Sequence, residues 1–133
     1  MTGRALGALF LVLLTGCAPP LLIKTKSEIR KSDLQVSQAA ACGDYQQIAR
    51  YWDEHATKMA VDGQGASHLT LIPEDRRAEI TVGKGPYFAL MDLKDAGGSR
   101  TTLTSYVAGP YFVEPLKGWE RQIQQAYPCK GPA

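Results

Sequence analysis

The sequence lacks the features that identify most enzymes and nucleic-acid-binding proteins. Its 133 residues include two histidines and three cysteines, and these do not follow a metal-ligand spacing. It contains neither a glycine-rich phosphate loop nor a serine nucleophile elbow. The formal net charge of +2 falls far short of the basic excess that binding to a phosphate backbone demands. The sequence therefore predicts no metal, no cofactor and no nucleic-acid partner.

Long apolar runs are also scarce, and the one that is present lies at the start of the chain. Residues 5–14 are all apolar or glycine and follow Arg4. The run is too short for a membrane-spanning helix, which needs about 20 residues. A basic residue ahead of a short apolar run is typical of a secretory signal peptide. We expect residues 1–16 to be that signal.

A specific motif follows the apolar run directly. Leu14-Thr15-Gly16-Cys17 places a large apolar residue and two small residues before a cysteine. This motif resembles the lipobox of bacterial lipoproteins, in which the cysteine sulfur takes a diacylglycerol and the freed amine is often acylated, for example with palmitate. The resemblance is confined to the first 17 residues. It implies that Cys17 carries a stable anchor, because two or more acyl chains bind a bilayer firmly.

The segment after the cysteine is expected to be a flexible tether over residues 17–31. Pro19 and Pro20 disfavour helix and sheet, and residues 24–31 are rich in basic side chains, which an anionic leaflet attracts. Aspartate after the cysteine commonly retains Gram-negative lipoproteins in the inner membrane, but here the residue is Ala18. The resemblance thus implies an outer-membrane protein of the cell envelope that faces the periplasm.

Two cysteines remain once Cys17 is acylated. A remaining pair in an exported protein is typical of a disulfide, so we expect Cys42 and Cys129 to be bonded to each other. A catalytic thiol is the alternative, with His55 or His68 as its base. No flanking motif accompanies either histidine.

The pattern of apolar residues over 32–133 predicts a single α+β domain. Apolar side chains recur at helical spacing over 44–60 and 116–127, and β-like segments with short connections lie between these two helices. We expect a four-stranded antiparallel meander with both helices on one face, and a disulfide that joins the start of the first helix to the end of the last. The expected strands are 68–72, 79–82, 87–93 and 101–107, residues 111–113 are expected to be extended, and residues 33–37 fit either a short edge strand or more tether.

One tetrapeptide occurs twice, as Gly85-Pro86-Tyr87-Phe88 and as Gly109-Pro110-Tyr111-Phe112. Two Gly-Pro turns at one rim of the sheet would present paired aromatic side chains to a ligand or partner. The alternative is that Gly-Pro begins a strand and Tyr-Phe fills the core. The candidate contact residues are Tyr87, Phe88, Tyr111 and Phe112.

Three functions are compatible with the sequence. The first is a non-enzymatic accessory or assembly lipoprotein that holds an envelope protein at the membrane, and the anchor together with the lack of catalytic motifs favours it. The second is a small apolar-ligand or lipid-binding module. The third is an envelope hydrolase, since such enzymes use paired carboxylates. Candidate residues are Trp52, Phe88, Tyr106 and Trp119 for an apolar cavity, and Asp92, Asp95, His55 and His68 for catalysis.

Overall fold

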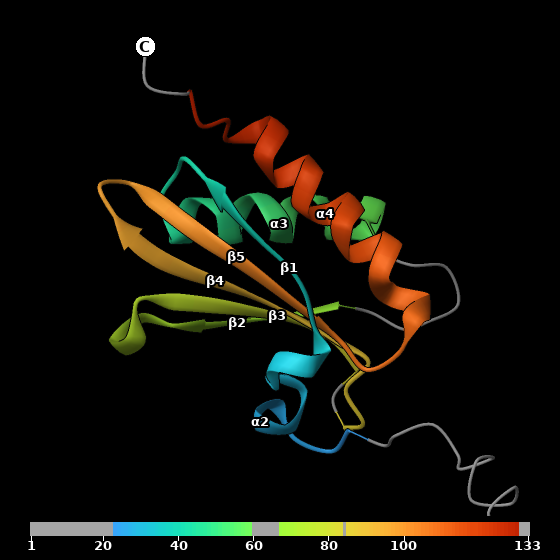
Figure 1. Cartoon of the computed structure of the whole chain (residues 1–133). Coiled ribbons are helices and arrows are strands. Elements are labelled where there is room, and N and C mark those ends of the chain that lie inside the picture. The colour runs from blue at the N-terminus through green and yellow to red at the C-terminus, as the bar shows by residue number, and fades with distance from the viewer. Residues whose placement is uncertain (1–22, 60–66, 84, 131–133) are drawn as a thin grey trace, which may run out of the picture.

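The computed structural model describes residues 23–59, 67–83 and 85–130. The expected signal peptide, Cys17 and the first part of the expected tether therefore lie outside the described residues. The chain forms a five-stranded antiparallel sheet with the strand order β1-β5-β4-β3-β2. Helices α3 and α4 cover one face of the sheet, and the short helix α2 lies at the other face (Figure 1). The α+β class and the antiparallel sheet are confirmed.

The helices and strands match most of the expected segments to within a few residues. The elements in chain order are α2 (Lys26–Ile29), β1 (Gln35–Ala41), α3 (Tyr45–Met59), β2 (Ser67–Ile72), β3 (Arg77–Val82), β4 (Ala89–Gly97), β5 (Arg100–Val107) and α4 (Val113–Ala126), with 3₁₀ turns at Ser32–Leu34, Pro73–Asp75 and Pro110–Phe112.

The sheet has one strand more than predicted. β1 pairs with β5, with Ala41 opposite Thr101, so β1 and not β5 forms this edge of the sheet. This strand reads Gln-Val-Ser-Gln-Ala-Ala-Ala and contains a single β-branched residue and no aromatic one, so its local strand propensity is weak. The expected extended segment 111–113 is also wrong, because a 3₁₀ turn leads there directly into α4.

The flexible tether predicted over 17–31 is wrong for its second half. Ile23 and Ile29 are 1% and 0% exposed and pack with Leu90 in a small apolar cluster. Thr25 caps α2, since its hydroxyl accepts a hydrogen bond from the Glu28 amide. Burial of these two apolar side chains stabilises a fixed conformation of the segment, and this effect exceeds the loss of the chain freedom expected for a basic tether. The chain is therefore fixed to the domain from Ile23 onward.

The main core lies between the sheet and the two long helices. Asp44 caps α3 by accepting a hydrogen bond from the Gln46 amide. Trp52 of α3 and Trp119 of α4 meet edge to face with ring centroids 4.6 Å apart. Both helices bury apolar side chains at helical spacing against every second residue of the strands. The buried members include Tyr45, Ile48, Leu116 and Ile123 from the helices and Ala78, Ile80, Met91, Leu93 and Leu103 from the sheet.

A disulfide joins Cys42, just before α3, to Cys129, just after α4, with Cα atoms 4.9 Å apart. This is the predicted pair in the predicted place. The Cys42 amide also donates a hydrogen bond to the Tyr127 carbonyl at 2.9 Å. The bridge thus fixes the ends of both long helices at one end of the sheet.

Candidate functional site

The sheet face away from α3 and α4, called the open face below, carries charged and polar side chains. Successive strand residues point to opposite faces, so the open-face positions follow from the buried ones. They are Arg77, Glu79 and Thr81 on β3, Leu90, Asp92 and Lys94 on β4, and Thr102, Thr104 and Tyr106 on β5. Helix α2 covers part of this face, beside Leu90.

Two carboxylates lie next to each other at the centre of the open face. Glu79 and Asp92 are direct cross-strand partners, and Glu79 is only 2% exposed. Like charges directly opposite each other destabilise a sheet, and a buried carboxylate must be paired. The pair therefore requires cations from elsewhere in the chain.

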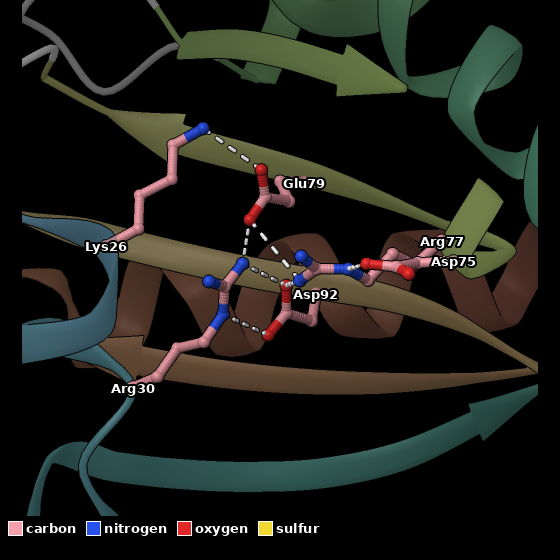
Figure 2. A network of polar contacts seen from close by, with 6 residues as sticks. All are labelled: Lys26, Arg30, Asp75, Arg77, Glu79 and Asp92. Carbon is pink, nitrogen blue, oxygen red and sulfur yellow. Dashed lines mark hydrogen bonds and ion pairs between the residues drawn. The ribbon is translucent and has the colours of Figure 1, made fainter. Parts of the chain in front are cut away.

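The α2 segment supplies those cations (Figure 2). Arg30 donates from Nε and Nη2 to the two Asp92 carboxylate oxygens, both at 2.9 Å, and Nη2 also contacts Glu79. Lys26 Nζ lies 3.0 Å from Glu79 Oε1. The bidentate geometry fixes the orientation of the guanidinium as well as its position. Ion pairs thus clamp the α2 segment to the middle of the sheet.

Arg77 completes the cluster with looser contacts. Its guanidinium lies 3.4 Å from Glu79, 3.5 Å from Asp92 and 3.4 Å from Asp75. These distances are at the outer limit of hydrogen bonding, so Arg77 retains capacity to bind a further acceptor. A surface pocket of about 400 Å³ opens at this point, and its lining consists of Arg30, Asp75, Arg77, Asp92, Lys94, Thr104 and Tyr106.

Tyr106 borders the same pocket. Desolvation by the surrounding groups raises the pKa of its hydroxyl above the usual range, and the charge of Asp92 raises it further. The hydroxyl is therefore neutral at physiological pH and can donate or accept a hydrogen bond. The open face as a whole offers fixed hydrogen-bonding groups and paired charges.

The four catalytic candidates do not converge. Asp92 lies on the open face and is bound by Arg30, whereas Asp95 lies three positions further along β4, points to the other face, and pairs with Arg76. The Gly97 amide and Arg76 together lower the pKa of Asp95. His55 stacks on Tyr51 of α3, and His68 lies on β2. This arrangement does not resemble a two-carboxylate hydrolase site.

The candidate cavity residues are also distributed. Trp52 and Trp119 are buried against each other beneath the helices, Tyr106 lies on the open face, and Phe88 is exposed at the end of the sheet. Within the described parts of the chain, no shared apolar cavity brings these four side chains together. The arrangement gives no support to the ligand-binding hypothesis in the form stated above.

The two Gly-Pro-Tyr-Phe segments, in contrast, do lie side by side. Phe88 stacks on Phe112 with ring centroids 5.9 Å apart, and Tyr111 meets Phe112 edge to face at 5.2 Å. Tyr87 is half-buried in the α2 cluster, and Phe112 is 5% exposed. Phe88 and Tyr111 therefore remain as the outward-facing members of the four candidates.

The sequence analysis does not predict the charged cluster of Lys26, Arg30, Arg77, Glu79 and Asp92, although the sequence contains one signal for it. Residues 77–82 read Arg-Ala-Glu-Ile-Thr-Val, which alternates polar and apolar as a strand with one polar face does. The sequence could not show that the cations come from a segment about 50 to 60 residues earlier, since Lys26 pairs at a separation of 53 and Arg30 at 62.

Comparison with known proteins identifies no relative. No family model matches the chain, and neither a curated protein nor a solved structure is significantly similar to it. Over the described residues, no helix is long and apolar enough to cross a membrane, and no group of three metal-ligating side chains occurs there.

Proposed function

We propose that this chain is a lipid-anchored accessory protein of the bacterial cell envelope, and that its open face binds a protein partner. The observation that carries the proposal is the clamp between α2 and the sheet. Arg30 and Lys26 fix the segment that follows the lipobox onto Glu79 and Asp92. A lipid on Cys17 would thereby hold a rigid, charged sheet face close to the membrane, which suits an adaptor that positions another protein.

The uncovered part of the open face has the chemistry of a protein-binding surface. Arg77 and the exposed Lys94 line the pocket, with Thr104 and Tyr106 beside them. Arginine and tyrosine are enriched at binding hot spots, because they combine a flat surface with directional hydrogen bonds. Arg77 and Lys94 favour a partner that inserts an acidic side chain, and the rigid ion pairs around them reduce the ordering cost of binding.

Acylation is the first expectation of this proposal. In cells grown with a labelled palmitate analogue, the full-length protein should incorporate the label and sediment with the envelope membranes. The Cys17→Ser variant should lose essentially all of the label and leave the membrane fraction, because no other residue in the lipobox can take the diacylglycerol. Unchanged labelling of Cys17→Ser would refute lipidation at this residue.

Partner binding is tested by photocrosslinking in intact cells. A benzophenone amino acid at Thr102, on the open face beside Lys94, should give a discrete protein adduct. The same probe at Gln125, an exposed residue of α4, is the matched control and should give none. Lys94→Glu should reduce the Thr102 adduct severalfold, since a reversed charge opposes an acidic partner. Equal adducts at both probe positions, or none at Thr102, would contradict the proposed surface.

A further inference from the structure

We propose that the end of the sheet that carries Phe88 and Tyr111, called the aromatic end below, lies in the headgroup layer of the lipid bilayer. The inference rests on the proposed function, because it requires an acylated Cys17. It adds an orientation: the anchor does not let the domain rotate freely above the membrane, but lays one defined end of it on the lipid surface.

The exposed apolar side chains are distributed unequally over the domain. Among the described residues, the large apolar side chains with high exposure are Leu71 at 49%, Phe88 at 40% and Tyr111 at 59%. Phe88 immediately precedes β4, and Tyr111 follows β5 by four residues. Since β4 starts where β5 ends, with Ala89 opposite Val107, both aromatic residues lie at the same end of the sheet.

The N-terminal segment reaches the domain at that same end. The Ile23 carbonyl accepts a hydrogen bond of 2.8 Å from the Tyr87 amide, and Ile23 itself is 1% exposed. Figure 1 shows α2 beneath the sheet, and Tyr87 before β4 and Ala108 after β5 pack in the same apolar cluster as Ile23. Ile23 is therefore fixed beside the two aromatic segments.

The distance from this point to the anchor is short. Only six residue steps separate Cys17 from Ile23, and six residues span at most about 20 Å when fully extended. The headgroup region that lies on each side of the hydrocarbon core is itself several ångströms thick. A lipid-bearing Cys17 at the bilayer surface thus holds the aromatic end within reach of the headgroups. The opposite end of the sheet, beside the Cys42–Cys129 bridge, points away from them.

The chemistry of the aromatic end fits a lipid surface. Tyrosine is enriched at membrane interfaces because its ring is apolar and its hydroxyl stays hydrated. Phe88 and Tyr111 are both held against the buried Phe112, so little side-chain freedom is lost on contact. Lys24 is exposed beside Ile23, where a basic group is attracted to anionic lipids.

The test measures membrane depth at two exposed positions of the acylated full-length protein. A fluorophore is attached to a single introduced cysteine, in Pro110→Cys, an exposed position beside Tyr111 that leaves both aromatic side chains in place, or, as the matched control, in Leu71→Cys. Leu71 is similarly exposed but lies next to the β2–β3 connection at the opposite end of the sheet. The proteins are reconstituted in vesicles of phosphatidylethanolamine and phosphatidylglycerol that contain headgroup-region nitroxide lipids.

We expect the nitroxide lipids to quench the probe at position 110 about threefold more strongly than the probe at position 71, as an interfacial location requires. Equal quenching of the two probes on vesicle-bound protein would overturn the orientation while leaving the anchor intact. If neither labelled protein floats with the vesicles, the anchor is absent, and both the proposed function and this inference fail.

Discussion

Replacing Cys42 and Cys129 together by serine is expected to lower the free energy of unfolding by about 4–5 kcal/mol. The bridge closes a loop with a sequence separation of 87, and a loop of that length greatly restricts the unfolded chain. Cys129 is exposed and Cys42 is half-buried, so replacing them by serine removes few packing contacts. Urea unfolding monitored by fluorescence of the buried tryptophans measures the difference.

The wild-type protein under reducing conditions serves as the control for that variant. Its unfolding curve should move toward the curve of the double-serine protein, whose own curve should not respond to the reductant. A loss below about 1 kcal/mol would mean that strain in the native state, or structure retained in the unfolded chain, offsets the entropic effect of the bridge.

Arg30→Met is expected to cost about 3 kcal/mol of folding free energy. The substitution keeps most of the side-chain volume but leaves the carboxylates of Glu79 and Asp92 facing each other, with Glu79 buried. Breaking a buried ion pair by removing one partner costs about 3–5 kcal/mol. We place the effect at the lower end because Arg30 is itself 23% exposed and because Lys26 and Arg77 remain near Glu79. Chemical denaturation at neutral pH measures it.

Arg76→Met provides a matched control. Arg76 also pairs with an aspartate of β4, Asp95, but the Arg76 side chain is 73% exposed, and solvent screens exposed ion pairs so that they contribute little to stability. The two substitutions therefore remove the same chemical group from equivalent partners in different environments. Similar losses for both variants would show that burial of Glu79 does not determine the strength of the cluster.

The elements with strong local signals were predictable from the sequence. Residues Tyr45, Ile48 and Trp52 repeat at helical spacing, and α3 buries all three. The strand segments rich in β-branched residues were placed within a few positions. The number of cysteines predicts that Cys42 pairs with Cys129, and these two residues form the disulfide.

The features that depend on distant contacts were not predictable. Pro19, Pro20 and the basic residues predict a tether, whereas Ile23 and Ile29 pack against Leu90 on the open face. Residues 35–41 have weak strand propensity, and they form β1 because they pair with the free edge of β5. The charged site required Arg30 and Asp92 to meet at a sequence separation of 62, which local patterns cannot reveal.

The pairing of β1 with β5 joins the first strand of the sheet to the last one along the chain. Gln35 lies opposite Tyr106, and α4 adds side-chain bonds from Gln124 to the Ala40 carbonyl and from the Ser37 hydroxyl to Glu120. Contacts between residues this far apart slow folding. The sheet partner of β1 begins only at Arg100, so we expect β1 to join the sheet after nearly the whole chain is available to fold.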